Sequence, residues 1–181
     1  MVELKEALLR LIPEFDLIED RELREKILHV WESALKSGGW RLDNLKKMPF
    51  TLLIPDCKIT FVEHVRSVVR MCMAVEKEFE DIYGERLKIN KDYLLAGALL
   101  HDIGKLVEYK EENGKFVKSS SGKLLRHPFS GVGLCYDQGI PDEILHIIAT
   151  HSKEGDLVKR TPEAIILHHV DFMNYEPFKE W

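Results

Sequence analysis

The sequence predicts an all-α protein, and three observations lead to that fold class. Apolar residues recur at helical spacing along most of the chain, the apolar runs begin and end at capping residues, and only one short stretch alternates like strands. The chain has 181 residues, 45% of them apolar and 31% charged, which is the profile of a globular protein. This length suffices for one domain of ordinary size and a small appendage.

Two helices are expected before residue 40. The first covers "VELKEALLRLI", whose leucines share one face, and it stops at Pro13. The second covers "DRELREKILHVWESALKSGG", with Asp20 as its N-terminal cap and Gly38 and Gly39 at its end. Residues 40 to 60 contain two prolines around the apolar "FTLLI", which predicts an irregular crossing segment with a short strand.

That crossing segment is the predicted boundary between an N-terminal helical extension, residues 1–60, and a main domain, residues 61–181. The main domain opens with a long helix from Phe61 to about Tyr83, and a second helix, capped by Asn90, follows as the apolar run "YLLAGALL". Asn-Gly between two short alternating arms then predicts a small hairpin or loop. Three helices that start at prolines complete the domain: Pro128 to about Asp137, Pro141 to about Ser152, and Pro162 to about Tyr175.

Five separate segments each direct a histidine or aspartate toward the predicted core. Burying an unpaired charge is costly, so these side chains need a partner. Imidazole and carboxylate groups are common ligands of Zn, Mn and Fe, and a bound cation makes buried carboxylates tolerable. The sequence therefore predicts a metal site built from His64, the pair His101 and Asp102, His127, His151 and Asp171.

Each of these residues also has an ordinary interpretation. A single histidine on an apolar face is more often a hydrogen-bonded core residue than a ligand, and Asp171 alone could pair with a lysine or arginine. The coincidence of five segments favours the metal. His29 and His146 lack that support and are interpreted as ordinary residues. His168 shares a face with Asp171 and could orient a metal ligand by a hydrogen bond.

The segment from Gly114 to His127 is basic in an otherwise acidic protein, with Lys115, Lys118, Lys123 and Arg126 and no acidic residue. One hypothesis is a mobile basic lid, with residues 119–122 as its flexible tip, that neutralises substrate phosphate. A solvated loop with incidental lysines explains the same pattern.

Composition excludes several other classes. The net charge of −5 argues against general nucleic-acid binding. No apolar run reaches the roughly 20 residues of a membrane helix, so we expect no membrane partner and a cytoplasmic location. The three cysteines have no CxxC or CxxH spacing, which predicts neither a disulfide framework nor a cysteine zinc site.

The order of these motifs resembles the HD-domain metal-dependent phosphohydrolase superfamily. The matching motifs are "HDIGK", "RHPFSG", "ATHS" and "HHVDF", preceded by His64, over roughly residues 61 to 175. The resemblance implies a helical bundle in which His64, His101, Asp102 and Asp171 hold one metal. It further implies that His127 and His151 hold a second metal, with Asp102 bridging the two. The "GYP" signature of the cyclic-dinucleotide phosphodiesterase branch is absent, and the two intermediate histidines, His127 and His151, do not form the His-His dipeptide of that branch. The layout is closer to the bacterial dinucleoside polyphosphate hydrolases.

This resemblance implies an enzyme that cleaves a phosphomonoester or phosphodiester of a small, nucleotide-like substrate by means of a metal-activated water. Two divalent transition-metal ions (Fe, Mn, Zn, Ni or Co), or Mg, are expected. Asp102 and Lys105 are the predicted catalytic residues, and Lys105 is expected to contact phosphate together with Lys118, Lys123 and Arg126; its ordinary role is a surface lysine. Two alternatives remain, a di-iron oxygenase and a non-catalytic nucleotide sensor. Two roles are open for the N-terminal helices: they cover the substrate pocket, or they make a homodimer contact through Trp31 and its neighbours.

Overall fold

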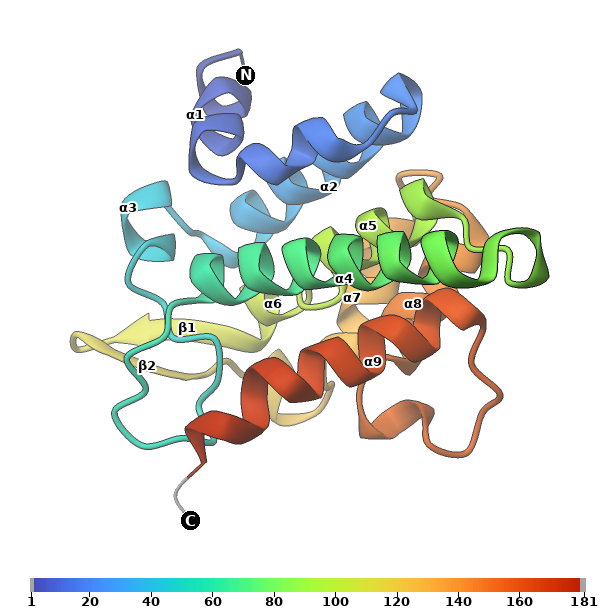
Figure 1. The fold of residues 1–181 in the computed structure, drawn as a ribbon. Helices are drawn as coiled ribbons and strands as arrows, with labels where there is room; N and C mark the ends of the chain where they lie inside the picture. The colour runs from blue at the N-terminus through green and yellow to red at the C-terminus, as the bar shows by residue number, and fades with distance from the viewer. Residues whose placement is uncertain (1, 180–181) are drawn as a thin grey trace.

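Helices make up most of the computed structural model, which describes residues 2–179, and its two strands form one antiparallel hairpin (Figure 1). The all-α prediction is confirmed. The helices are α1 (Val2–Leu11), α2 (Arg21–Gly38), α3 (Leu42–Leu45), α4 (Phe61–Tyr83), α5 (Lys91–Leu100), α6 (Lys105–Glu108), α7 (His127–Tyr136), α8 (Asp142–Thr150) and α9 (Pro162–Tyr175). The strands are β1 (Tyr109–Glu112) and β2 (Lys115–Lys118). None of the helices within residues 2–179 is both long and apolar enough to cross a membrane.

Helix α2 begins and ends where its capping residues predict. The Asp20 carboxylate accepts hydrogen bonds from two backbone N–H groups of the first turn, and Gly39 ends the helix with φ of +68°. Trp31 on this helix is fully buried and donates its indole N–H to the Leu99 carbonyl, 3.1 Å away. The extension therefore packs onto α5 through Trp31, which leaves that ring no surface for the expected dimer contact. Dimerisation itself stays a prediction, as does the domain boundary at residue 60.

The short strand expected within residues 40–60 is not formed. One helical turn, α3, and a single bridge between Pro49 and Thr60 take its place. The backbone N–H of Phe50 donates to the Ile59 carbonyl and closes residues 50–59 into a loop, so no neighbouring strand is available for a ladder. The loop places the buried Phe50 ring against His64, with ring centroids 4.6 Å apart.

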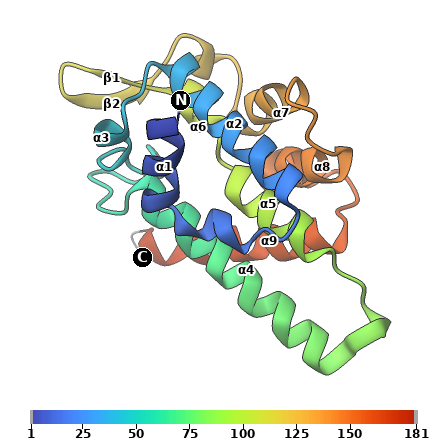
Figure 2. The ribbon, with the colours of Figure 1, turned by 90° about the horizontal axis from the view of Figure 1, so that it is seen from above.

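Helices α4, α5, α8 and α9 form the bundle that carries the site. Figure 2 shows α4 alongside α9, with α5 between α4 and α8, and the same helix pairs are in contact. Thr60 and Glu63 form a capping box at the start of α4, and Asn90 caps α5 as predicted. Gly97 lets α5 approach α8 closely, because a Cβ there would lie 2.6 Å from Ile147 Cγ2.

The apolar run of α5 stops at Leu100, and residues 101–104 form turns before α6 begins at Lys105. Gly104 lets α7 approach this turn closely, since a Cβ at that position would overlap the backbone oxygen of His127 at the start of α7. The contact brings "HDIG" against α7, so His101 and Asp102 sit at the end of a buried helix rather than along its side.

The predicted hairpin is formed around Asn113 and Gly114, which both have positive φ angles, as a two-residue hairpin turn requires. The flexible tip hypothesised after it, residues 119–122, contacts α6 through two of its four residues. The Ser119 backbone N–H donates to the Glu108 carbonyl at 2.8 Å, and its hydroxyl donates to the Val107 carbonyl at 2.7 Å. Gly122 is buried against the Glu108 backbone, where a Cβ would not fit. Ser119 and Gly122 thus contact α6, whereas Ser120 and Ser121 between them are exposed.

Candidate metal centre

Six side chains from five segments meet inside the bundle. Five of them are almost completely buried, and the sixth, Asp171, exposes 16% of its side chain. They come from α4, the turn after α5, the first residue of α7, the residue after α8, and α9. The full set is His64, His101, Asp102, His127, His151 and Asp171, which are the residues predicted as ligands.

The first cluster surrounds Nε2 of His64. This atom lies 3.3 Å from His101 Nε2, 3.4 Å from Asp102 Oδ2 and 3.1 Å from Asp171 Oδ1. His101 Nε2 is in turn 3.4 Å from the same Asp102 oxygen. His64, His101 and Asp102 thus place two nitrogens and one oxygen close enough together to share an ion, which suits a divalent transition metal. The Asp171 oxygen lies beside the two nitrogens, 3.1 Å from that of His64 and 3.8 Å from that of His101.

The second cluster contains the other oxygen of Asp102. His127 Nε2 lies 3.2 Å from His151 Nε2 and 3.2 Å from Asp102 Oδ1, and His151 Nε2 lies 3.8 Å from that oxygen. The two oxygens of one carboxylate therefore face two different groups of donor atoms. This arrangement suits a carboxylate that bridges two cations.

The hydrogen bonds of the imidazole rings explain why a cation fits here. His101 Nδ1 lies 2.8 Å from the Ala98 carbonyl, and His151 Nδ1 lies 2.7 Å from the Ile148 carbonyl. A carbonyl only accepts, so each Nδ1 carries the proton, and in a neutral ring Nε2 then holds a lone pair. Burial and the neighbouring His101 and His127 lower the pKa of His151 to about 3, so this ring is neutral at pH 7. For His101, burial is outweighed by the Asp102 carboxylate, which raises its pKa. The Nε2 lone pair of His151 faces the Asp102 oxygen, and the two repel unless a cation lies between them.

Lys105 is not a surface residue. Only 7% exposed, it donates from Nζ to Asp102 Oδ2 and to the Phe50 carbonyl, each at 2.6 Å. Burial lowers the pKa of Lys105, but the Asp102 carboxylate more than offsets this and leaves the pKa raised. The ammonium group therefore stays charged, directly beside the carboxylate that joins the two clusters.

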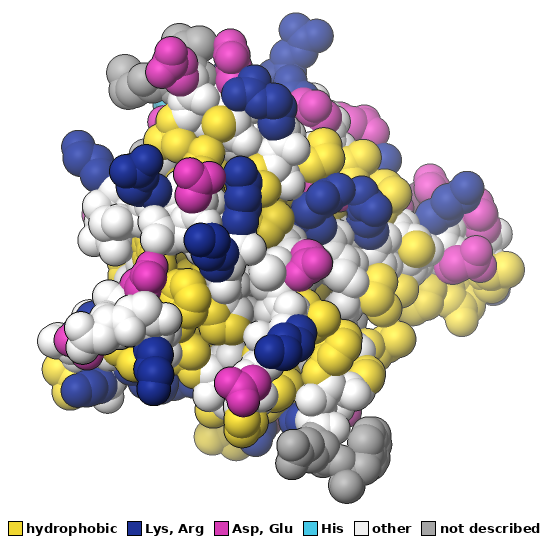
Figure 3. All heavy atoms as spheres, turned by 90° about the vertical axis from the view of Figure 1, so that its left-hand side faces the viewer, with side chains coloured by type: hydrophobic (Ala, Val, Ile, Leu, Met, Phe, Trp, Pro, Cys, Tyr) yellow, Lys and Arg dark blue, Asp and Glu magenta, His cyan; other side chains and the backbone are white. Residues whose placement is uncertain are grey.

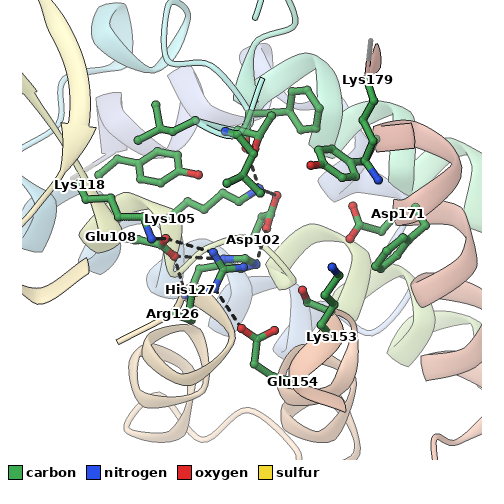
Figure 4. A pocket seen from close by; sticks show the side chains of 18 residues that line it. Asp102, Lys105, Glu108, Lys118, Arg126, His127, Lys153, Glu154, Asp171 and Lys179 are labelled. Carbon is green, nitrogen blue, oxygen red and sulfur yellow. Dashed lines mark hydrogen bonds and ion pairs between the residues drawn. The ribbon is translucent and has the colours of Figure 1, made fainter. Parts of the chain in front are cut away.

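A cavity of about 360 Å³ opens above Asp102 (Figure 4). Lys118 and Arg126 lie on one side of it, and Lys179 lies on the other, beyond Asp171. Among the residues predicted to bind substrate, Lys105, Lys118 and Arg126 line this cavity. The structure does not bring Lys123 there, because its side chain is exposed and lies outside the lining.

Sequence reasoning missed several residues of this site. Lys153 lies two residues after His151 and lines the cavity, so its position beside a predicted ligand was an available signal. Lys179 and the ring of Phe172 also line it, and no motif marks them. Glu108, which contacts His127, was missed as well, because an acidic residue in "LVEYK" has no distinctive spacing.

Fold and site together define a helical protein with buried histidine and aspartate groups that can hold divalent metal. The family model described as "HD domain" matches residues 61–173, and the chain belongs to that family. The predicted resemblance is thereby confirmed, and the matched range includes every candidate ligand.

Three curated relatives are similar to the chain. The dihydroneopterin 2',3'-cyclic phosphate phosphodiesterase of Methanocaldococcus jannaschii is 30% identical over 170 residues, which is 90% of this chain and 66% of the relative. The 3'-5' exoribonucleases YhaM of Listeria welshimeri and Oceanobacillus iheyensis are 31% and 33% identical over 123 and 116 residues. Those alignments cover 61% and 56% of this chain, but only 37% and 35% of the relatives. No solved structure gives a significant match.

Proposed function

We propose that the chain is a metal-dependent phosphohydrolase that cleaves a phosphate ester bond of a small, nucleotide-like molecule. The observation that carries the proposal is Asp102, whose two oxygens face two donor clusters at the floor of a cavity lined with cations. Two divalent ions bound there would lower the pKa of a water and supply the attacking hydroxide.

The protein's own side chains have separate roles in this proposal. His64, His101 and Asp171 would hold the first ion, His127 and His151 would hold the second, and Asp102 would serve both. Lys105 keeps its proton on Nζ next to Asp102 Oδ2 and is placed to donate a hydrogen bond to a phosphate oxygen. Lys118 and Arg126 neutralise further phosphate charge from one side of the cavity.

A small cyclic or terminal phosphate ester is the favoured substrate. Residues 61–181 make up two-thirds of the chain, so an alignment over 90% of it must include most of the N-terminal extension. The relative with that coverage is named as a phosphodiesterase of a 2',3'-cyclic phosphate. A cavity of about 360 Å³ is near the lower end for small-molecule sites and suits a single nucleotide-sized ligand.

The 3' end of an RNA chain is the second candidate, because two relatives are named as 3'-5' exoribonucleases. The charge distribution favours it less. The net charge is −5, and on the face that carries α1 and the hairpin, basic and acidic side chains are interspersed (Figure 3). Nothing in the comparisons favours the alternatives of a di-iron oxygenase or a nucleotide sensor.

A substrate panel tests the proposal. Purified protein is loaded with Mn²⁺ or, without air, with Fe²⁺, and is offered nucleoside 2',3'-cyclic phosphates, nucleoside monophosphates, dinucleoside polyphosphates and short RNA. We expect hydrolysis of a small ester and none with Asp102→Asn. Oxygen uptake without phosphate ester cleavage would instead indicate the oxygenase. Tight nucleotide binding without turnover would indicate the sensor.

The cationic side of the cavity provides a second, internal test. Replacing Lys118 and Arg126 together by alanine should raise KM for the phosphorylated substrate about tenfold or more, because charge-assisted hydrogen bonds contribute about 1.5–3 kcal/mol each. Lys123→Ala is the matched control, since this lysine of the same segment is exposed and lies outside the cavity. An equal effect of both changes on KM would contradict the assignment.

A further inference from the structure

Glu108, the last residue of α6, is a buried carboxylate that contacts a candidate metal ligand. Only 1% of it is exposed. Its Oε2 accepts hydrogen bonds from the backbone N–H of His127 at 2.6 Å and from the ring Nδ1 at 3.1 Å. A carboxylate that accepts from Nδ1 requires the proton to be on that nitrogen, so the lone pair of His127 is on Nε2. This is the atom that faces Asp102 and His151.

The other oxygen of Glu108 faces the two cations of the cavity wall. Lys118 Nζ lies 3.3 Å from Oε1, and Arg126 Nη1 lies 3.7 Å from it (Figure 4). The two oxygens of Glu108 thus contact different groups. One side of the carboxylate orients a ligand, and the other side keeps two positive charges next to that ligand.

The backbone around Glu108 is fixed as well. The Ser119 N–H donates to the Glu108 carbonyl, and Gly122 packs so closely against this backbone that a Cβ would overlap it. These contacts hold β2 and the segment that leads to Arg126 against α6. The carboxylate therefore has little freedom to leave His127.

Glu108 also differs from the partners of the other candidate ligands. His101 and His151 donate from Nδ1 to backbone carbonyls, which are neutral. Among residues 2–179, His127 is the candidate ligand whose Nδ1 faces a carboxylate. A negative partner makes the imidazole more basic and hence a better metal ligand.

We propose that Glu108 is a positioning residue for the second metal: it fixes the tautomer and orientation of His127 and strengthens its bond to the ion. The inference rests on the two-metal site proposed above. It concerns metal affinity, which is measurable without any substrate.

Mn²⁺ binding to the metal-free protein tests the inference. Calorimetry measures the affinity of each position, and electron paramagnetic resonance shows whether both positions are occupied. Glu108→Gln should weaken binding at one position about 10–100-fold and leave the other at wild-type affinity. The spin-coupled signal of two neighbouring Mn²⁺ ions should then give way to that of a single ion. Glu154→Gln is the matched control, because Glu154 also pairs with Arg126, at 3.0 Å, but makes no hydrogen bond or ion pair with His127. It should keep both affinities.

A double-variant cycle shows whether Glu108 acts through His127. His127→Ala should itself remove the second ion, and adding Glu108→Gln should then change the remaining affinity less than twofold. Wild-type affinities at both positions in Glu108→Gln would overturn the inference. Equal weakening of both positions with a lower Tm would overturn it too, by assigning Glu108 a general structural role. A wild-type protein that binds no Mn²⁺ would contradict the two-metal site itself and the inference with it.

Discussion

The buried pair of Lys105 and Asp102 allows a test that separates stability from activity. Lys105 is 7% exposed and Asp102 is 2% exposed, and their charged atoms are 2.6 Å apart. Asp102→Asn keeps the shape of the side chain but removes its charge. The ammonium of Lys105 then keeps only neutral acceptors, namely the new amide oxygen and the Phe50 carbonyl.

The expected loss of stability follows from the Lys105 ammonium, which stays buried without its carboxylate partner. Removing one partner of a buried ion pair typically destabilises by about 3–5 kcal/mol. Because two neutral oxygens still accept from Lys105, we expect about 3 kcal/mol, a large part of the roughly 5–15 kcal/mol that stabilises a typical domain. Adding Lys105→Met removes the unpaired charge and fills a similar volume, so most of the lost stability should return.

Urea unfolding in EDTA measures this series without any contribution from metal. The denaturation midpoint of Asp102→Asn should be clearly below that of the wild type, and the midpoint of the double variant should lie between them or higher. Both variants should lack hydrolase activity. A single variant as stable as the wild type, or a double variant no more stable than the single one, would show that the unpaired ammonium of Lys105 is not destabilising.

Three other changes have equally direct outcomes. Gly104→Ala should lower the free energy of unfolding by about 1–3 kcal/mol or more, because the new Cβ overlaps α7. The control Gly133→Ala, whose new Cβ meets no atom within 4 Å, should leave this free energy unchanged or raise it by up to about 1 kcal/mol. Equal Tm values for the two variants would contradict this. Removing metal with EDTA should lower Tm, because an ion present at about 100 times its Kd stabilises the folded state by roughly 2.7 kcal/mol. A thermal unfolding curve that EDTA does not change would contradict the proposed metal site. The pKa of His151 is about 3 in the folded protein against 6.5 ordinarily, so its contribution to metal-free stability is complete above pH 6.5 and is lost as the pH falls toward 3. His151→Gln should therefore flatten the fall of the urea midpoint between pH 7 and pH 5, and an unchanged slope would disagree.

Local signals made much of the fold predictable. The ends of α2, the start of α5 and the hairpin turn are set by Asp20, Gly39, Asn90 and the Asn113-Gly114 pair, and each acts through its own backbone neighbours. Helix α9 begins at Pro162 as expected, while Pro128 is the second residue of α7 and Pro141 is the residue before α8.

Features that depend on distant contacts were not predictable. The close approach of α7 to the turn after Leu100 depends on Gly104, and burial of Lys105 depends on the loop that carries the Phe50 carbonyl. Residues 119–122 look like a free loop in sequence, but Ser119 and Gly122 lie against the backbone of α6. The partner of His127 is 19 positions away, at Glu108, so no short-range pattern could reveal it.

Asp102 is proposed to stand between two metal ions, and anomalous diffraction from crystals of the Mn²⁺-loaded protein would locate those ions. Two anomalous peaks are expected, one beside Nε2 of His64 and His101, the other beside Nε2 of His127 and His151. Each peak should be bonded to a different oxygen of Asp102. A single peak, or two peaks that do not share Asp102, would contradict the account.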